Sequence, residues 1–252
     1  MIRKEIKKYV EDLKSMNLEI TSLCNMSKDH CTQCPNDWRA KNFGVTKIDL
    51  EVIKRFFKEL NELGYTGATG LHSYNEPLMD KRIYHIIELH KEICPKATIS
   101  ILSNGRLMDQ SVTEKLLKLG VDRITISAYE SSTYNRLFRI FEDLKPKYPD
   151  CIFAINRQAL DNRMQYYDWP TRAELGLPVI QTCKRVRDQL IVTATGEMQL
   201  CCYEWKKEMK FGNINENTLT EILENSTFLT IREDLIKGYR DKYFPCDRCL
   251  YG

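Results

Sequence analysis

The sequence predicts an α/β fold: a partial (β/α) barrel of five to six parallel strands, followed by a small cysteine-rich α+β module. Over roughly the first 180 residues, short apolar strands alternate with amphipathic helices, as parallel strands with right-handed crossovers require. After Cys183 this alternation is replaced by a hairpin, two short helices and a final Cys-x-x-Cys pair. We therefore expect two domains, at residues 1–182 and 183–252. An open doubly wound sheet would fit the same alternation.

The first domain is expected to contain five strand–helix units. Residues 17–22 alternate apolar and polar side chains, which predicts the first strand. The next four strands are expected at residues 68–74, 98–103, 123–128 and 152–156. The intervening helices are expected at residues 49–63, 81–93, 110–119 and 132–144. A sixth unit within residues 161–182 is ambiguous.

The two ends of helix 49–63 show how the boundaries of these elements are predicted. Helix 49–63 has one apolar face, and Thr46 with Asp49 suggests a capping box at its start. Gly64 then ends the helix.

In the second domain, the hairpin strands are expected at residues 189–193 and 197–201, and the helices at 219–224 and 228–237. The carboxyl ends of parallel strands meet at one edge, where we expect the active site.

Composition excludes several classes of protein. The 252 residues include 38 Lys and Arg against 35 Asp and Glu, a net charge of +3. This near-neutral balance does not predict a broad basic surface of the kind that binds nucleic acid. No window is apolar enough to span a membrane, and the charged start does not resemble a secretory signal. We expect a cytoplasmic protein without a membrane partner, in which cysteines are reduced and act as ligands.

The cysteines are the unusual feature of the composition, and there are ten of them. Cys94 and Cys151 suit the interior as small hydrophobic residues. An early group, Cys24, Cys31 and Cys34, directly follows the first strand. Three thiolates can hold three irons of a 4Fe-4S cluster and leave the fourth iron open. A zinc site with a fourth ligand is the alternative.

The residue able to complete such a zinc site is His30, within the same loop.

Three further segments follow the next strands. In chain order they are Tyr74-Asn75-Glu76-Pro77, Ser103-Asn104-Gly105 and Ser127. With the cysteine loop, this order resembles the radical S-adenosylmethionine (SAM) family over residues 17–182. The resemblance implies that the open iron binds the amino and carboxylate groups of SAM.

The same resemblance implies which residues contact SAM. The segment containing Tyr74, Asn75, Glu76 and Pro77 would bind the SAM amino group. Positions matching Ser103, Asn104 and Ser127 would approach the ribose or the carboxylate, and Arg136 would pair with the carboxylate.

Two departures from the family pattern stand in the cysteine loop. Six residues separate Cys24 from Cys31, where the family has three. A longer loop costs little closure entropy per added residue. Gln33 stands where the family carries an aromatic residue near the adenine, and Trp38 is a candidate substitute.

The late cysteines form a second group. Cys183, Cys201, Cys246 and Cys249, with Gly196, resemble the twitch module, a shortened relative of the SPASM domain. The resemblance implies an auxiliary 4Fe-4S cluster, hence two clusters in total, with Cys202 a bystander. A zinc ribbon would use the same four thiolates.

The expected activity follows from this resemblance. SAM is cleaved to a 5′-deoxyadenosyl radical, which takes a hydrogen atom from the substrate. With the auxiliary cluster accepting an electron, the reaction oxidises a secondary alcohol of a small sugar or aminocyclitol to a ketone. Arg157, Glu204 and His30 are candidates for assisting the proton transfer. A flavodoxin- or ferredoxin-type protein is the expected electron donor.

Two other functions fit the sequence. The first is a peptide-modifying enzyme of the same superfamily, which would cross-link or epimerise a residue of a short peptide. Cys202 would then be a candidate hydrogen-atom donor. The second is a zinc-stabilised binding module without catalysis, whose basic stretches 184–187 and 206–210 would contact nucleic acid.

Overall fold

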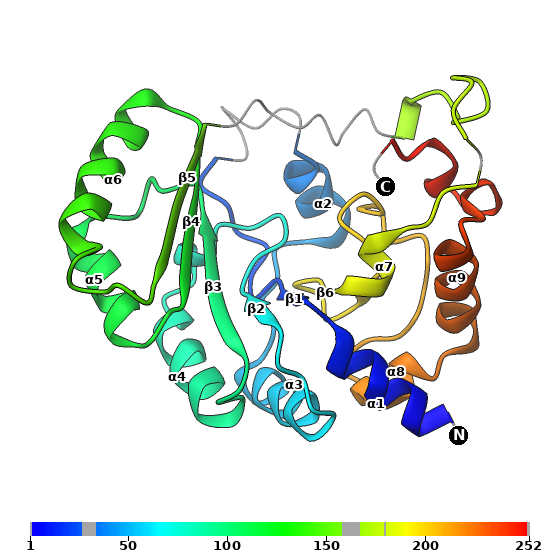
Figure 1. Ribbon diagram of the computed structural model, residues 1–252, viewed down its shortest axis with the longest axis horizontal. Helices are drawn as coiled ribbons and strands as arrows, with labels where there is room; N and C mark the ends of the chain where they lie inside the picture. The colour runs from blue at the N-terminus through cyan, green and yellow to red at the C-terminus, as the bar shows by residue number, and fades with distance from the viewer. Residues whose placement is uncertain (1, 27–33, 158–166, 179, 251–252) are drawn as a thin grey trace.

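The computed structural model describes residues 2–26, 34–157, 167–178 and 180–250. Within them lies a sheet of order β5-β4-β3-β2-β1-β6-β7 (Figure 1). Strands β1 to β5 are parallel neighbours in chain order, so the winding does not reverse among them. This order confirms the partial barrel. The strands are β1 Ser15–Leu18, β2 Ala68–Gly70, β3 Thr98–Ser103, β4 Arg123–Ala128, β5 Ile152–Arg157, β6 Gln189–Val192 and β7 Met198–Gln199.

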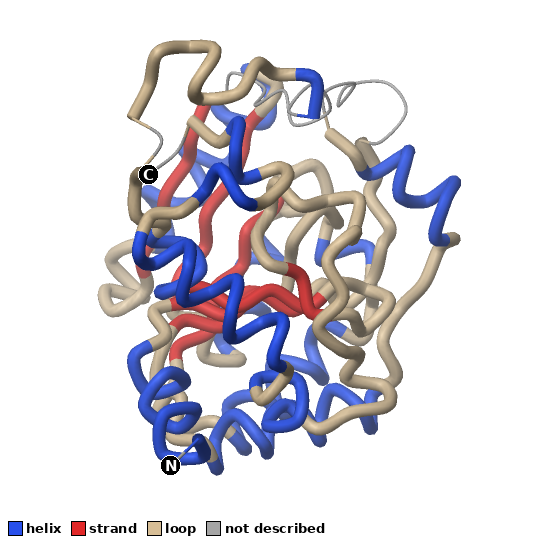
Figure 2. Tube along the Cα trace, turned by 90° about the vertical axis from the view of Figure 1, so that its right-hand side faces the viewer, coloured by secondary structure: helices blue, strands red, loops and turns tan. Residues whose placement is uncertain are grey.

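Helices pack outside this sheet. Figure 1 shows α4, α5 and α6 along the outer side of β3, β4 and β5, and Figure 2 shows strands in the interior. The α-helices are α1 Ile2–Asp12, α2 Asn36–Phe43, α3 Leu50–Glu62, α4 Ile83–Ile93, α5 Gln110–Lys118, α6 Ser131–Leu144, α7 Lys184–Asp188, α8 Leu219–Leu223 and α9 Ser226–Lys237. Short 3-10 turns are η1 Pro77–Met79, η3 Arg240–Lys242 and η4 Cys246–Arg248.

The sixth parallel strand comes from the C-terminal part of the chain. β6 pairs in parallel with β1, from Ser15 opposite Gln189 to Leu18 opposite Val192. The described residues of the range 161–182 contain no strand, while residues 161–166 and 179 lie outside the description. The expected hairpin is confirmed, since β6 and β7 pair antiparallel. The sheet therefore runs across the boundary expected at residue 183, and the division into domains stays a prediction.

A single hydrophobic core joins the two parts of the chain. Fully buried side chains reach from Val10 in α1 to Leu235 in α9. Cys94 belongs to this core: its sulfur lies 3.2 Å from the carbonyl oxygen of Phe57, and burial raises its pKa to about 12. Its expected structural role is confirmed.

Three local expectations were wrong. The first strand was expected at residues 17–22 but spans Ser15–Leu18. Asp49 is itself the N-cap of α3 and accepts a hydrogen bond from the Glu51 amide at 2.8 Å, so it does not form a capping box with Thr46. Strand β2 was expected to reach residue 74 but ends at Gly70. The amide of Tyr74 instead donates to the carboxylate of Glu19, which takes the chain out of the sheet.

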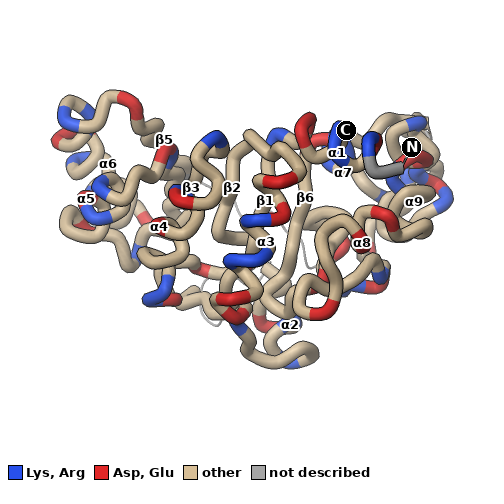
Figure 3. Tube along the Cα trace, turned by 90° about the horizontal axis from the view of Figure 1, so that it is seen from below, with Lys and Arg blue, Asp and Glu red and all other residues tan. Residues whose placement is uncertain are grey.

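The distribution of charged residues and the hydropathy of the helices agree with what the composition predicted. Figure 3 shows acidic and basic residues interspersed, with no broad face of one sign in that view. In the described part of the chain, no helix has the length and apolar character needed to cross a membrane.

His90 is a buried, neutral histidine within this core. Its Nε2 lies 2.9 Å from the Thr69 hydroxyl, and its ring packs edge-on against Phe57. Burial, assisted by the charge of Lys91, lowers its pKa to about 4. As the pH falls, the imidazole therefore takes up a proton at a higher pH in the unfolded chain than in the folded protein.

We expect a specific loss of stability in acid. Between the unfolded pKa of about 6.5 and the folded value, the unfolded state binds more protons, so the free energy of unfolding falls by about 3 kcal/mol as pH decreases. Anaerobic urea unfolding across this range should show the slope, and His90→Gln should reduce it. His85→Gln, at an exposed site of α4, is the matched control. Equal slopes in wild type and His90→Gln would contradict the assignment.

Candidate active site at the carboxyl ends of the strands

The predicted SAM-binding segments lie together at one edge of the sheet. The cysteine loop follows β1, the segment from Tyr74 to Pro77 follows β2, and Asn104 follows β3. Ser127 lies near the end of β4 and is buried. These strands are parallel neighbours, so their carboxyl ends form a common rim.

Glu76 connects two of these segments. Its buried carboxylate accepts hydrogen bonds from the Ser103 hydroxyl at 2.9 Å and from the Asn104 amide at 2.7 Å. Burial raises the pKa of Glu76, and these hydrogen bonds act against the rise. The side-chain amide of Asn104 donates to Asn25 at 2.7 Å, beside Cys24. The loops after β1, β2 and β3 are therefore linked through side chains.

A second buried carboxylate, Glu19, lies just beyond β1. It accepts two hydrogen bonds from Arg39, at 2.9 and 3.0 Å, in a fork-to-fork ion pair. The amides of Tyr74 and Ala194 each donate to the same carboxylate at 3.0 Å. Burial lowers the pKa of Arg39, but the Glu19 charge outweighs it and the pKa is raised. One carboxylate thus joins α2 to the chain after β1, β2 and β6.

Tyr74 extends from the predicted SAM segment toward the second cysteine group. Its hydroxyl donates to the carbonyl oxygen of Cys202, and Gln199 Nε2 lies 3.4 Å from that hydroxyl. The guanidinium carbon of Arg39 lies 4.4 Å from the centre of the Tyr74 ring. The sequence did not predict this contact between the two parts of the chain.

Two other predicted SAM contacts support loops. Asn75 accepts from the Ser73 amide at 2.9 Å and so stabilises its own turn. The Arg136 guanidinium donates to the carbonyl oxygens of Met108 and Gly105, the latter at 2.9 Å. Both contacts hold the loops around the site, and their roles toward SAM stay predictions.

Gly105 closes the turn after β3 and has no room for a side chain. Its φ is +76°, in the left-handed region that favours glycine, and a Cβ would lie 2.5 Å from Leu137 Cδ1. A glycine is therefore required at this position by both backbone and packing.

The early cysteines are only partly described. Cys24 and Cys34 are half-buried, whereas Cys31 and His30 lie outside the described residues. Burial raises the pKa of Cys24 to about 11, and the nearby Cys34 and Glu76 raise it further. Thiolates at this site would be stabilised by a bound cation, as expected of metal ligands.

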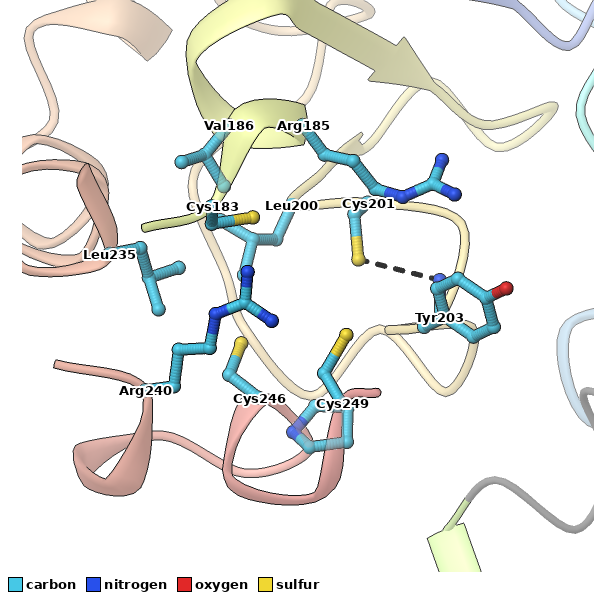
Figure 4. A pocket seen from close by; sticks show the side chains of 11 residues that line it. Cys183, Arg185, Val186, Leu200, Cys201, Tyr203, Leu235, Arg240, Cys246 and Cys249 are labelled. Atoms are coloured by element: carbon cyan, nitrogen blue, oxygen red, sulfur yellow. Dashed lines mark hydrogen bonds between the residues drawn. The ribbon is translucent and has the colours of Figure 1, made fainter. Parts of the chain in front are cut away.

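The four late cysteines line one pocket (Figure 4). Cys183 precedes α7, Cys201 follows β7, and Cys246 and Cys249 flank the η4 turn. The Tyr203 amide lies 3.4 Å from the Cys201 sulfur. Burial raises the pKa of Cys201 and of Cys246, and neighbouring thiols add to both effects.

The four thiols of this pocket are the ligand set that a 4Fe-4S cluster or a structural zinc ion takes. In Figure 4 their sulfurs border one common space. In the conformation described, no group of three or more Cys, His, Asp or Glu side chains has the spacing of a metal-ion site among the described residues. Cys202 does not line the pocket.

The three candidates for proton transfer differ in how much of each side chain the structure describes. Glu204 is buried, and its Oε1 accepts from the Glu208 amide at 2.6 Å. Its Oε2 makes no hydrogen bond within the described structure, and burial raises its pKa to about 7. Arg157 ends β5 opposite Ala128, but its side chain lies outside the described residues, as does His30.

An aromatic layer, formed by Trp38, Tyr74, Tyr167, Tyr203 and Trp205, contacts both cysteine groups. Cys34 of the first group and Cys201 and Cys249 of the second pack against it. The rings of Trp38 and Trp205 lie 5.0 Å apart, and those of Tyr167 and Trp205 lie 4.8 Å apart. Trp38 therefore has a packing role. No sequence signal pointed to this layer, because its members are far apart along the chain.

Comparison with known families divides the chain as the cysteines do. The profile of the radical SAM superfamily matches residues 18–145. The profile of the SPASM domain, an iron-sulfur cluster-binding domain, matches residues 183–250. SAM and two iron–sulfur clusters are the corresponding cofactors.

Individual relatives cover nearly the whole chain. The S-adenosyl-L-methionine-dependent 2-deoxy-scyllo-inosamine dehydrogenase of Niallia circulans is 24% identical over 93% of this chain and 91% of its own. The crystal structure of BtrN in complex with AdoMet and 2-DOIA has a TM-score of 0.76 at 23% identity, covering 94% of this chain and 93% of BtrN.

A more distant structure is anSMEcpe with bound AdoMet and the Cp18Cys peptide. Its TM-score is 0.58 at 15% identity, covering 94% of this chain and 86% of anSMEcpe. These likenesses show a shared fold. Because the family profile matches residues 18–145, half of its length, the chain belongs to the radical SAM superfamily.

Proposed function

We propose that this protein is a radical SAM dehydrogenase that oxidises a secondary alcohol of a small sugar or aminocyclitol to a ketone. The supporting observation is the likeness to 2-deoxy-scyllo-inosamine dehydrogenase, which extends over 93% of this chain. That length includes both cysteine groups and the aromatic layer between them. A relative sharing only the SAM-binding half would not favour a second redox site.

The two cysteine groups are assigned to two clusters. Cys24, Cys31 and Cys34 would hold the SAM-binding cluster, and the auxiliary cluster would be held by Cys183, Cys201, Cys246 and Cys249. When bound, these groups with SAM supply a 5′-deoxyadenosyl radical at one site and an electron acceptor at the other.

The residues around the first site have positioning tasks. Glu76 orients the turn at Asn104, and Arg136 supports the carbonyl oxygens of the same loop. We place SAM against this rim, near Tyr74–Pro77, Ser103, Asn104 and Ser127. Side chains already locked by hydrogen bonds lose little further freedom when a ligand binds.

Alcohol oxidation also needs a proton acceptor. Once a hydrogen atom has left the carbinol carbon, the substrate must lose its hydroxyl proton and one electron to form the ketone. Glu204 is our candidate for accepting the proton, because a pKa near 7 suits proton transfer at neutral pH. Arg157 and His30 remain candidates for orienting the oxygen or assisting transfer.

The aromatic layer would shield the electron path from water. Its buried rings pack against Cys34 and Cys201, so this region has a low dielectric constant. A dry path protects a reactive substrate radical from side reactions. We also propose a cytoplasmic location and a flavodoxin- or ferredoxin-type electron donor, consistent with free thiols throughout the described cysteines.

Peptide modification is the second candidate function. It is favoured by the fold likeness to anSMEcpe, whose structure contains a peptide. The two functions differ in substrate size and in the fate of the electron. One set of assays separates them.

The first prediction concerns the product. Anaerobically reconstituted protein, supplied with SAM and a reductant, should convert an aminocyclitol to a ketone with the loss of two hydrogens and release of 5′-deoxyadenosine. Mass spectrometry after hydrazine trapping would detect the carbonyl. Release of deoxyadenosine without any carbonyl product would contradict dehydrogenation, and modification of a supplied peptide instead would establish the second candidate.

The second prediction concerns the clusters. Wild-type protein should hold about eight irons, and Cys24→Ala with Cys31→Ala and Cys34→Ala should remove about half of them. Removing the four late cysteines should have the complementary effect. Cys202→Ala and Cys94→Ala are the controls and should keep the wild-type iron content. A loss of iron in Cys202→Ala would make that residue a ligand.

The third prediction concerns Glu204. Glu204→Gln should slow ketone formation by roughly 10²–10⁴-fold, the usual contribution of a positioned base. SAM cleavage should continue, because the hydrogen bonds that Glu204 makes in the described structure go to the amides of Glu208 and Met209 and not to the predicted SAM segments. Glu208→Gln, at an exposed neighbour, is the matched control. Unchanged ketone formation in Glu204→Gln would remove it as the base.

A further inference from the structure

We propose that Arg185 and Arg240 supply positive charge to the auxiliary-cluster pocket and thereby raise the reduction potential of that cluster. The purpose of this arrangement rests on the proposed function, in which the cluster accepts an electron from the substrate. The charge arrangement itself does not depend on the substrate. It follows from the residues that line the pocket.

Arg240 approaches the pocket from the η3 turn. It is 1% exposed, and its guanidinium donates to the carbonyl oxygens of Gln181 and Thr182, each at 2.7 Å. These bonds fix its orientation next to Cys183. Figure 4 shows the guanidinium extending into the space bordered by Cys183 and Cys246. The charge is thus held in place by the backbone of the segment that carries a cluster ligand.

Arg185 approaches from a different element, helix α7. It lines the same pocket, and its guanidinium carbon lies 5.4 Å from the centre of the Tyr203 ring. Two independent segments therefore bring a permanent cation to the four cysteines.

The described residues that line the pocket include two arginines and no Asp or Glu. They are Cys183, Arg185, Val186, Leu200, Cys201, Tyr203, Leu235, Arg240, Pro245, Cys246 and Cys249. Asp247 lies in the sequence between two ligands and pairs with Arg248 at 3.1 Å. Arg185 and Arg240 therefore supply the cationic side chains of this described lining.

Positive charge favours the reduced form of such a cluster. Four thiolate ligands make the cluster site negative, and reduction adds one more negative charge. A nearby cation stabilises this added charge, and partial burial strengthens the interaction by keeping water and salt away. Arginine suits this task because it stays protonated under all working conditions. The result is a cluster that accepts an electron more readily.

The test measures the potential directly. A background of Cys24→Ala, Cys31→Ala and Cys34→Ala retains only the auxiliary cluster, whose midpoint potential can be titrated anaerobically by electron paramagnetic resonance. Arg185→Gln and Arg240→Gln should each shift the midpoint to a lower value. Arg185→Lys keeps the charge and should have a midpoint potential close to that of the wild-type residue. Arg187→Gln is the matched control on the same helix, because Arg187 is exposed and pairs with Asp188 at 2.7 Å.

The outcomes separate this inference from the proposed function. An unchanged midpoint in Arg185→Gln, with full iron content, overturns the inference even if Arg240→Gln fails to fold. An equal shift in Arg187→Gln would also overturn it, since that charge lies outside the pocket. The ketone assay is independent: a shifted midpoint without ketone formation overturns the proposed function alone.

Discussion

The buried carboxylate of Glu19 is the interaction on which the active-site architecture depends. It accepts hydrogen bonds from Arg39, from the Tyr74 amide and from the Ala194 amide. A buried charge that loses its partner costs roughly 3–5 kcal/mol, so these groups must converge for the protein to fold. Arg39 brings helix α2 with it, and α2 starts directly after the cysteine loop. One buried carboxylate therefore joins α2 to the chain segments that follow three strands.

The same convergence joins the two cysteine groups into one structure. Ala194 follows β6, which pairs with β1, so the C-terminal part is attached to the sheet itself. Tyr74 adds a side-chain bond to the loop that carries Cys201. The aromatic layer packs against cysteines of both groups. The two groups are thereby held by packed side chains, which have little freedom to shift.

Charge is used differently at the two sites. At the SAM-binding rim, Glu76 takes its hydrogen bonds from Ser103 and Asn104, so the carboxylate serves the scaffold. At the auxiliary pocket, Arg185 and Arg240 face thiol ligands without a carboxylate among the described lining residues. The first arrangement fixes geometry, and the second favours the reduced state of a bound cluster. Both use buried groups, whose interactions are little screened by salt.

The sequence by itself determined the alternation of strands and helices, the five parallel strands and the grouping of the cysteines. These features depend on local periodicity and spacing, which are readable along the chain. Strands β3 and β4 have the bounds that the sequence predicted. The tertiary structure alone decided the pairing of β6 with β1, the turn of Tyr74 toward Cys202, and the placement of Arg185 and Arg240 in the lining of one pocket. Each of these joins residues distant in sequence, and no local pattern specifies which distant backbone or side chain will become the partner.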